Sequence, residues 1–341
     1  MLRRSSTISS ASSSASSSAI LGLLFLTLSA CGKSAPPPEE PADPGPSTAQ
    51  DGGEVTPASS DAVKRGRDQI QAGDFAGAAE TLGAAAQADA KDPQAAFYHG
   101  VALEGLERFE DAEAEYRRAV ELSPELIEAH ANLSFLLLSL DKPKDALAAA
   151  DAGLKVDPKQ PALLANRAGA LDVLGDPKAL SAYEDLLKVT PDDAANRYNY
   201  AVVLAVAERK ADAAAALDVI RLQDVTDVGL LHDVGELYGR LEAYGSCVKA
   251  FDFAIMAGKS AELLAQRARC KHSAGDDKGA EADLRDAVAT EPQNPIGHYY
   301  LGKHLIAAGK KAEGQASLKK AVSLGPDTPF GKAAARDLKA K

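Results

Sequence analysis

Apolar, alanine-rich segments recur through most of the chain, and prolines follow them at regular intervals. Five such prolines set the spacing: Pro124, Pro158, Pro191, Pro292 and Pro326. Their separations are 34, 33, 101 and 34 residues, and 101 residues is the length of three such intervals. Because proline cannot continue a helix, each of these positions indicates a helix end. The spacing therefore predicts repeated helical units of 33 or 34 residues.

The same spacing divides residues 59–328 into eight units, which begin at residues 59, 93, 127, 161, 194, 228, 261 and 295. The residue at position 8 of every unit is small. The residue at position 20 is also small, when the two 33-residue units are aligned with a one-residue gap. Position 24 is mostly large: Leu82, Tyr116, Ala150, Tyr183, Leu217, Phe251, Leu284 and Leu318. Facing small residues let two antiparallel helices approach closely, and the large residue is expected to fill the gap to the next unit. Each unit is thus predicted to be a helix pair that buries its apolar stripe by stacking on its neighbours.

Residues 105–124, Gly-Leu-Glu-Arg-Phe-Glu-Asp-Ala-Glu-Ala-Glu-Tyr-Arg-Arg-Ala-Val-Glu-Leu-Ser-Pro, closely resemble the second helix of a tetratricopeptide repeat. The resemblance covers residues 59–328 and implies an all-α fold, a right-handed α-solenoid of about eight helix hairpins. Residues 329–341 are predicted to form a helix that caps the last apolar face. Val225 and Lys259 stand where proline is usual, so the register of units five and six is left open. A globular helix bundle is the alternative all-α fold, and the fixed spacing disfavours it.

The first thirty residues have the features of an export signal. Arg3 and Arg4 are followed by an apolar stretch at residues 19–28, which is too short to cross a bilayer as a helix. Leu28-Ser29-Ala30-Cys31 resembles the bacterial lipobox. The resemblance implies that residues 1–30 are a cleaved signal peptide and that Cys31 is acylated, since several acyl chains anchor a protein stably. The alternative is an ordinary secretory signal that precedes a chance cysteine.

The segment after the predicted cleavage point cannot build a core. Residues 32–58 contain seven prolines, and few large apolar residues interrupt them. Such a composition predicts disorder. Residues 31–58 are therefore expected to be an acylated cysteine and a proline-rich tether that holds the folded body clear of the membrane.

Composition narrows the class of partner. Aromatic residues make up 5% of the chain, charged residues 26%, and tryptophan is absent, as is typical of packed amphipathic helices with small residues at their contacts. The formal net charge is -11. This charge disfavours nonspecific binding of nucleic acid and close contact with anionic lipid.

The sequence contains no recognised arrangement for catalysis. None of the six histidines has another histidine three or four residues away, so no metal site on a single helix face is expected. His232 and His272 stand alone on separate units. Serine-nucleophile, phosphate-loop and dinucleotide motifs are also missing. The prediction is a protein that is not an enzyme, with no catalytic residue, metal, cofactor or small-molecule substrate.

Cys247 and Cys270 belong to neighbouring helices, the second of unit six and the first of unit seven. An exported compartment is oxidising, so a disulfide between them is chemically permitted. The alternative is that Cys247 replaces the usual small residue at position 20 and that Cys270 is a small apolar residue. Both interpretations stay open at this point.

The resemblance implies a binding surface on the first helix of each pair, chiefly at positions 2, 5, 9, 12 and 13. At these positions the chain has an interrupted apolar strip suited to an extended or helical peptide: Phe97, Val101, Ala131, Phe135, Leu138, Tyr198, Val202 and Tyr299. Aromatic residues at position 5 are also common in the repeat for packing reasons. Phe135 and Leu138 are therefore the stronger candidates.

The sequence as a whole predicts a membrane-anchored scaffold that binds protein or peptide partners in the cell envelope. Gly32 after Cys31 fits retention in the outer membrane under the sorting rule of enteric bacteria, with the body facing the periplasm. The alternative functions are an accessory or regulatory subunit of a peptidoglycan enzyme and a pilotin-like assembly factor for an outer-membrane complex. No residue distinguishes among these partners.

Overall fold

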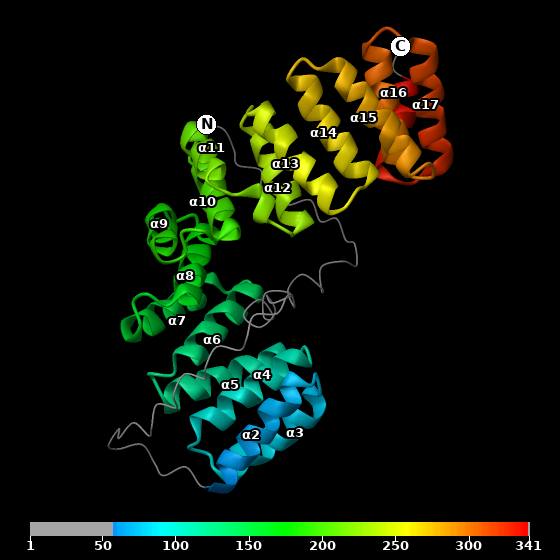
Figure 1. Cartoon of the computed structure of the whole chain (residues 1–341). Coiled ribbons are helices and arrows are strands. Elements are labelled where there is room, and N and C mark those ends of the chain that lie inside the picture. The colour runs from blue at the N-terminus through cyan, green and yellow to red at the C-terminus, as the bar shows by residue number, and fades with distance from the viewer. Residues whose placement is uncertain (1–56, 340–341) are drawn as a thin grey trace, which may run out of the picture. The chain divides into compact units, whose positions relative to one another are not determined.

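The computed structural model describes residues 57–339, with side chains from Ser60 onward. Within that range it contains seventeen α-helices, one short 3-10 helix and no strand (Figure 1). This confirms the all-α class. The predicted signal peptide, Cys31 and most of the predicted tether lie outside the described residues. Among the described helices, none is both long and apolar enough to cross a membrane.

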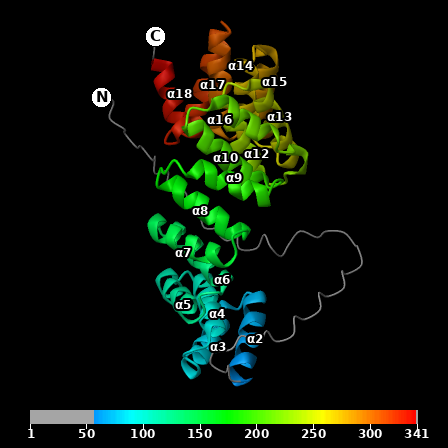
Figure 2. The same ribbon diagram turned by 90° about the vertical axis from the view of Figure 1, so that its left-hand side faces the viewer.

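Sixteen of the helices form eight hairpins that follow one another in chain order (Figures 1 and 2). The pairs are α2 (Pro57–Gln71) with α3 (Phe75–Ala88), α4 (Pro93–Gly105) with α5 (Phe109–Leu122), α6 (Ile127–Ser139) with α7 (Pro143–Val156), α8 (Pro161–Val173) with α9 (Ala179–Val189), α10 (Ala194–Val206) with α11 (Lys210–Asp218), α12 (Val228–Arg240) with α13 (Tyr244–Ala257), α14 (Ala261–Ser273) with α15 (Asp277–Thr290), and α16 (Pro295–Ala307) with α17 (Lys311–Leu324). The first helices of the last seven pairs begin at the first residues of units two to eight. Contacts between neighbouring hairpins confirm a stack of repeats.

Each hairpin turns at the same unit position, residue 15, where the backbone is left-handed. Glycine occupies it in four units, at Gly73, Gly175, Gly275 and Gly309. The other four units have an acidic residue with a φ between 56° and 63°: Glu107, Asp141, Glu208 and Glu242. Glycine adopts this conformation without the steric cost of a Cβ atom, whereas other residues adopt it less readily. The common position shows that all eight turns share one geometry.

The small and large positions pack as partners within each hairpin. A Cβ atom added to Gly100 would lie 2.8 Å from the Tyr116 ring, and one added to Gly235 would lie 2.7 Å from the Phe251 ring. Position 24 therefore occupies the space left by position 8 of its own unit. It also shares a core with the next unit, as expected: Leu82 lies in one cluster with Ala95 and Ala102, and Tyr116 in another with Ala129 and Leu133. The hydroxyl group of Tyr116 reaches the next unit as well, where Asn132 Nδ2 donates to it at 3.3 Å.

Unit five differs from the others at its second helix. Helix α11 has nine residues and is followed by the 3-10 helix η1 (Leu222–Asp224), which contacts α13. Leu222 and Val225 pack against the core that contains Phe251. The residue that replaces proline in this unit thus belongs to a segment that links units five and six.

A covalent bond and a charge network join units six and seven. The structure pairs Cys247 of α13 with Cys270 of α14 in a disulfide, with Cα atoms 6.0 Å apart, and so resolves the alternatives left open by the sequence. Nearby, Arg267 of α14 donates to both carboxylate oxygens of Asp283 at 2.7 and 2.8 Å and to Asp252 at 2.7 Å. Lys271 Nζ lies 2.9 Å from Asp283 Oδ2. Asp283 is 5% exposed, so its charge is balanced inside the protein.

The C-terminal helix α18 (Pro329–Lys339) packs on α17 and α16. Its Phe330 ring lies with its centroid 5.8 Å from those of Tyr299 and Tyr300. Ala334 is fully buried against Leu318 and Ala321 of α17. The last hairpin is therefore covered by a helix, as a solenoid end requires.

Candidate functional site

The predicted binding residues all lie on the first helices of their hairpins, but two of them are buried. Phe97 on α4 is 7% exposed and its ring lies 5.9 Å, centroid to centroid, from that of Tyr116. Ala131 on α6 is 9% exposed and packs in a small core with Ala150 and Leu163. Both side chains contribute to packing, because position 5 faces the neighbouring helices.

The remaining predicted residues are half-buried. Val101 and Leu138 pack beside the core of units two and three, and Tyr198 and Val202 pack beside the core of units five and six. Leu138 lies next to α8, since a Cβ atom on Gly169 would be 3.8 Å from it. Phe135 is also half-buried. Each of these side chains has some surface that a partner can reach.

Tyr299 differs from the others because the capping helix lies against it. Its ring contacts Tyr300, with centroids 5.1 Å apart, and Phe330 of α18. Lys303 Nζ lies 5.7 Å from the Tyr299 ring centroid. The contacts of Tyr299 are thus mainly those of a packing residue at the end of the stack.

The most exposed apolar side chains on the first helices were not named from the sequence. Val173 on α8 is 63% exposed and Val206 on α10 is 77% exposed. Both occupy position 13 of their units. Position 13 belongs to the set that the family resemblance implies, so a reading of every unit at that position would have found them.

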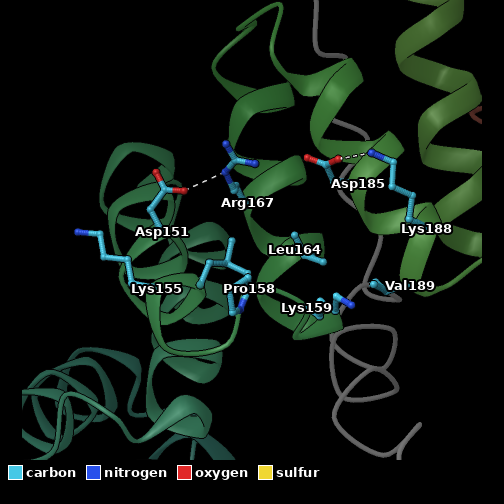
Figure 3. A pocket seen from close by; sticks show the side chains of 10 residues that line it. Asp151, Lys155, Pro158, Lys159, Leu164, Arg167, Asp185, Lys188 and Val189 are labelled. Carbon is cyan, nitrogen blue, oxygen red and sulfur yellow. Dashed lines mark hydrogen bonds and ion pairs between the residues drawn. The ribbon is translucent and has the colours of Figure 1, made fainter.

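Two hollows lie on different parts of the stack. One has a volume of about 380 Å³ and is formed by α7, the turn after it, α8 and α9 (Figure 3). Its charged groups largely pair with one another: Arg167 Nε lies 2.9 Å from Asp151 and Lys188 Nζ lies 2.7 Å from Asp185. A second hollow of about 490 Å³ lies between α2 and α4, where Arg67 lies over the Tyr98 ring. Neither hollow contains a predicted binding residue.

A third hollow, of about 330 Å³, lies between the first helices α14 and α16. Its lining is apolar at the floor and basic at the rim: Ala265, Ala268, Arg269, His272, Leu284, Tyr300, Lys303, His304 and Ala307. Several of these residues occupy positions 5, 9, 12 and 13. This part of the predicted surface therefore differs in charge from the apolar strip on α6, α8 and α10.

His272 stands alone on its unit in the sequence, but in the structure it has a histidine and an aspartate as neighbours. His304 of the next unit lies with its ring centroid 5.8 Å from that of His272, and Asp277 accepts a hydrogen bond from His272 Nδ1 at 2.5 Å. The two histidines are 32 residues apart, so a search within single helices could not find them. Their positions in adjacent units were the signal, because adjacent first helices lie side by side.

Perturbed acidic groups occur in the core. Burial raises the pKa of Glu104, and the hydrogen bond donated by the Tyr116 hydroxyl at 2.6 Å acts in the opposite direction. Burial, with the nearby Glu104 as a second cause, raises the pKa of Tyr116 well above its usual range. This pair packs beside the Phe97 ring rather than in any of the three hollows described above. Its arrangement fits a structural role.

Comparison with protein families gives a match to the tetratricopeptide repeat over residues 63–127 and 177–224. These two segments, in the first half and the middle of the described chain, are therefore similar to tetratricopeptide repeats. The tetratricopeptide-repeat fold supports binding of a protein or peptide partner. Comparison with curated proteins gives no match.

Several solved structures of tetratricopeptide-repeat proteins are similar in fold. A protein from Parabacteroides merdae is 17% identical, with 83% of this chain and 98% of that chain covered and a TM-score of 0.43. Yeast Tom70 is 15% identical, with 84% of this chain and 66% of the Tom70 chain covered and a TM-score of 0.47. YrrB, described as having an unusual peptide-binding site, is 16% identical, with 65% of this chain and 97% of the YrrB chain covered and a TM-score of 0.40.

Proposed function

We propose that this tetratricopeptide-repeat protein is a membrane-tethered scaffold of the bacterial cell envelope that binds apolar protein segments along its first helices. The observation that carries the proposal is the exposure of Val173 and Val206 at equivalent positions of consecutive units. Burial of a valine side chain in an interface contributes about 1.5–3 kcal/mol. A contiguous exposed apolar patch is typical of an interaction site.

The neighbouring side chains extend this surface. Phe135 and Leu138 on α6 precede Val173 in the stack, and Tyr198 and Val202 lie on the same helix as Val206. Tyrosine and phenylalanine rings supply large contact area at a low cost in side-chain entropy. A partner segment with apolar residues at helical or alternating spacing would fit such a strip.

Replacement of both Val173 and Val206 by aspartate is expected to weaken partner binding by about tenfold or more, because a charge must then be buried against an apolar partner. The measurement is recovery of crosslinked partners by the full chain from its own cells, quantified against wild type. Met256→Asp is the matched control, since Met256 is 80% exposed but lies on the second helix α13. Equal recovery by V173D/V206D and wild type would overturn the assignment of the surface.

The tether is proposed to hold this surface at the outer membrane, facing the periplasm. The support is the lipobox resemblance at residues 28–31 and the proline-rich segment after it. Cys31→Ser is expected to move the chain from the membrane fraction to the soluble fraction, because no acyl chain can then be attached to the sulfur. Membrane fractionation on a density gradient and the mass of the mature N-terminal peptide report the result. A C31S chain that stays in the outer-membrane fraction would contradict the proposal.

A further inference from the structure

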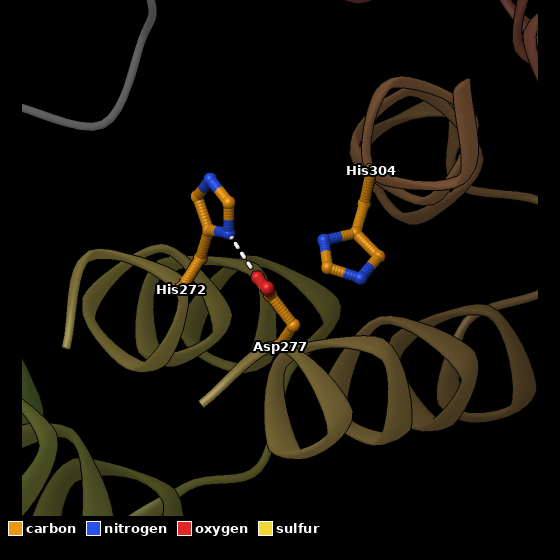
Figure 4. A group of neighbouring side chains, drawn as sticks. All are labelled: His272, Asp277 and His304. Carbon is orange, nitrogen blue, oxygen red and sulfur yellow. Dashed lines mark hydrogen bonds and ion pairs between the residues drawn. The ribbon is translucent and has the colours of Figure 1, made fainter. Parts of the chain in front are cut away.

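Three side chains of the types that bind metal ions, from three different helices, meet beside the hollow between α14 and α16, and two of them, His272 and His304, line it (Figure 4). His272 lies in the last turn of α14, Asp277 is the first residue of α15, and His304 lies in the last turn of α16. One ligand atom from each residue lies within 4.8 Å of the other two. The group thus joins both helices of unit seven to the first helix of unit eight.

The distances suit a bound ion after small side-chain movements. Zinc binds imidazole nitrogen and carboxylate oxygen at about 2.0–2.2 Å, so ligand atoms in a tetrahedral site are roughly 3.4 Å apart. The His272 and Asp277 atoms, now 2.5 Å apart, would separate by nearly 1 Å, and the more distant pair would approach. His272 and Asp277 are 58% and 66% exposed, so their side chains have room to rotate.

The surroundings contain both favourable and unfavourable charge for a cation. Arg269 and Lys303 line the same hollow, but Arg269 is hydrogen-bonded to Gln266 and lies 3.5 Å from Glu236, while Lys303 lies over the Tyr299 ring. Two histidines lie at helix C-termini, where the helix dipole favours positive charge. Asp277 supplies the negative charge next to the imidazoles.

We propose that His272, Asp277 and His304 form a binding site for a divalent transition-metal ion, with Zn²⁺ as its representative. Two imidazole nitrogens and one carboxylate select zinc, nickel or copper over calcium and magnesium, which prefer oxygen ligands. Three protein ligands leave a fourth position for water or for a side chain of a partner. The ion stabilises the contact between units seven and eight, since it binds the folded arrangement and not the separated helices.

Zinc binding is tested on the purified full chain after removal of any affinity tag, by calorimetric titration with zinc chloride in a chelator-free buffer. The expected result for wild type is one site that H304A and D277N each weaken by about 100-fold, because loss of a direct ligand costs at least as much as loss of an outer one. Zinc is also expected to raise the midpoint temperature of the wild-type chain and not that of H304A.

His298→Ala is the matched control, because His298 lies on the same helix as His304 and hydrogen-bonds through Nε2 to the Pro292 carbonyl oxygen. It should bind zinc as wild type does, and circular dichroism should show that each variant is folded. The visible spectrum of the cobalt-loaded chain should lose its d–d bands in H304A. Absence of a zinc site in wild type, or binding that H272A and H304A leave unchanged, would overturn the proposal.

Discussion

Replacement of Asp283 by alanine is expected to lower the free energy of unfolding by about 3–5 kcal/mol, because it removes the buried carboxylate that two largely covered cations share. Asp283 is 5% exposed and accepts two hydrogen bonds from Arg267, and Lys271 Nζ lies 2.9 Å from it. Arg267 and Lys271 are themselves only 18% and 20% exposed, so water cannot replace the lost carboxylate fully.

The control for Asp283 is the other carboxylate on Arg267. Asp252 is 47% exposed, and D252A should cost about 1 kcal/mol or less, since pairs near solvent contribute little. Repeats do not always unfold together, so urea denaturation is best combined with hydrogen exchange of the α14 and α15 amides. A similar loss of protection in both variants would refute the buried-network explanation.

Phe251→Ala is expected to destabilise units five to seven by about 3–5 kcal/mol, the usual cost of removing a fully buried aromatic ring. Phe251 is 1% exposed and lies against Gly235 in its own hairpin, with the His232 ring 5.8 Å away. The glycine at position 8 has no side chain that could fill the space left by the ring. The variant therefore leaves a cavity at the centre of the unit.

Met256→Ala provides the comparison for Phe251 on the same helix. Met256 is 80% exposed, so the substitution should change stability by no more than about 0.5 kcal/mol. Thermal and urea unfolding, followed by circular dichroism, report both variants. The packing assignment fails if F251A is as stable as M256A.

The repeat order could be predicted from sequence because each unit uses the same local rules. Small residues such as Gly100 and Gly235 mark where helices approach, and prolines such as Pro158 and Pro292 mark where they end. These signals depend only on residues within one unit. The left-handed backbone at position 15 was not predicted for the units without glycine there, because acidic residues such as Glu107 and Asp141 give no sequence sign of it.

The candidate sites were harder to predict because they depend on contacts between different helices. Phe97 is predicted to face a partner, yet its ring packs against Tyr116, which fills the space beside Gly100. His272 and His304 meet only because unit seven stacks on unit eight. A pattern within one helix carries no information on either contact.

The boundary between units five and six differs in structure from the other unit boundaries. The sequence marks Val225 as a departure from the repeat, but it does not say what replaces the proline. The structure places η1 there, and Leu222 and Val225 pack on the core of unit six. The short helix η1 supplies apolar contacts to this core after α11, which has only nine residues.

The disulfide between Cys247 and Cys270 affects what happens when a protease cleaves the stack of hairpins. In a chain of units that touch only their neighbours, melting can start at an end and advance one hairpin at a time. Cys247 and Cys270 are joined across the boundary of units six and seven. A protease that cuts the loop between them would therefore leave two fragments attached, and the nicked protein would keep its two halves together.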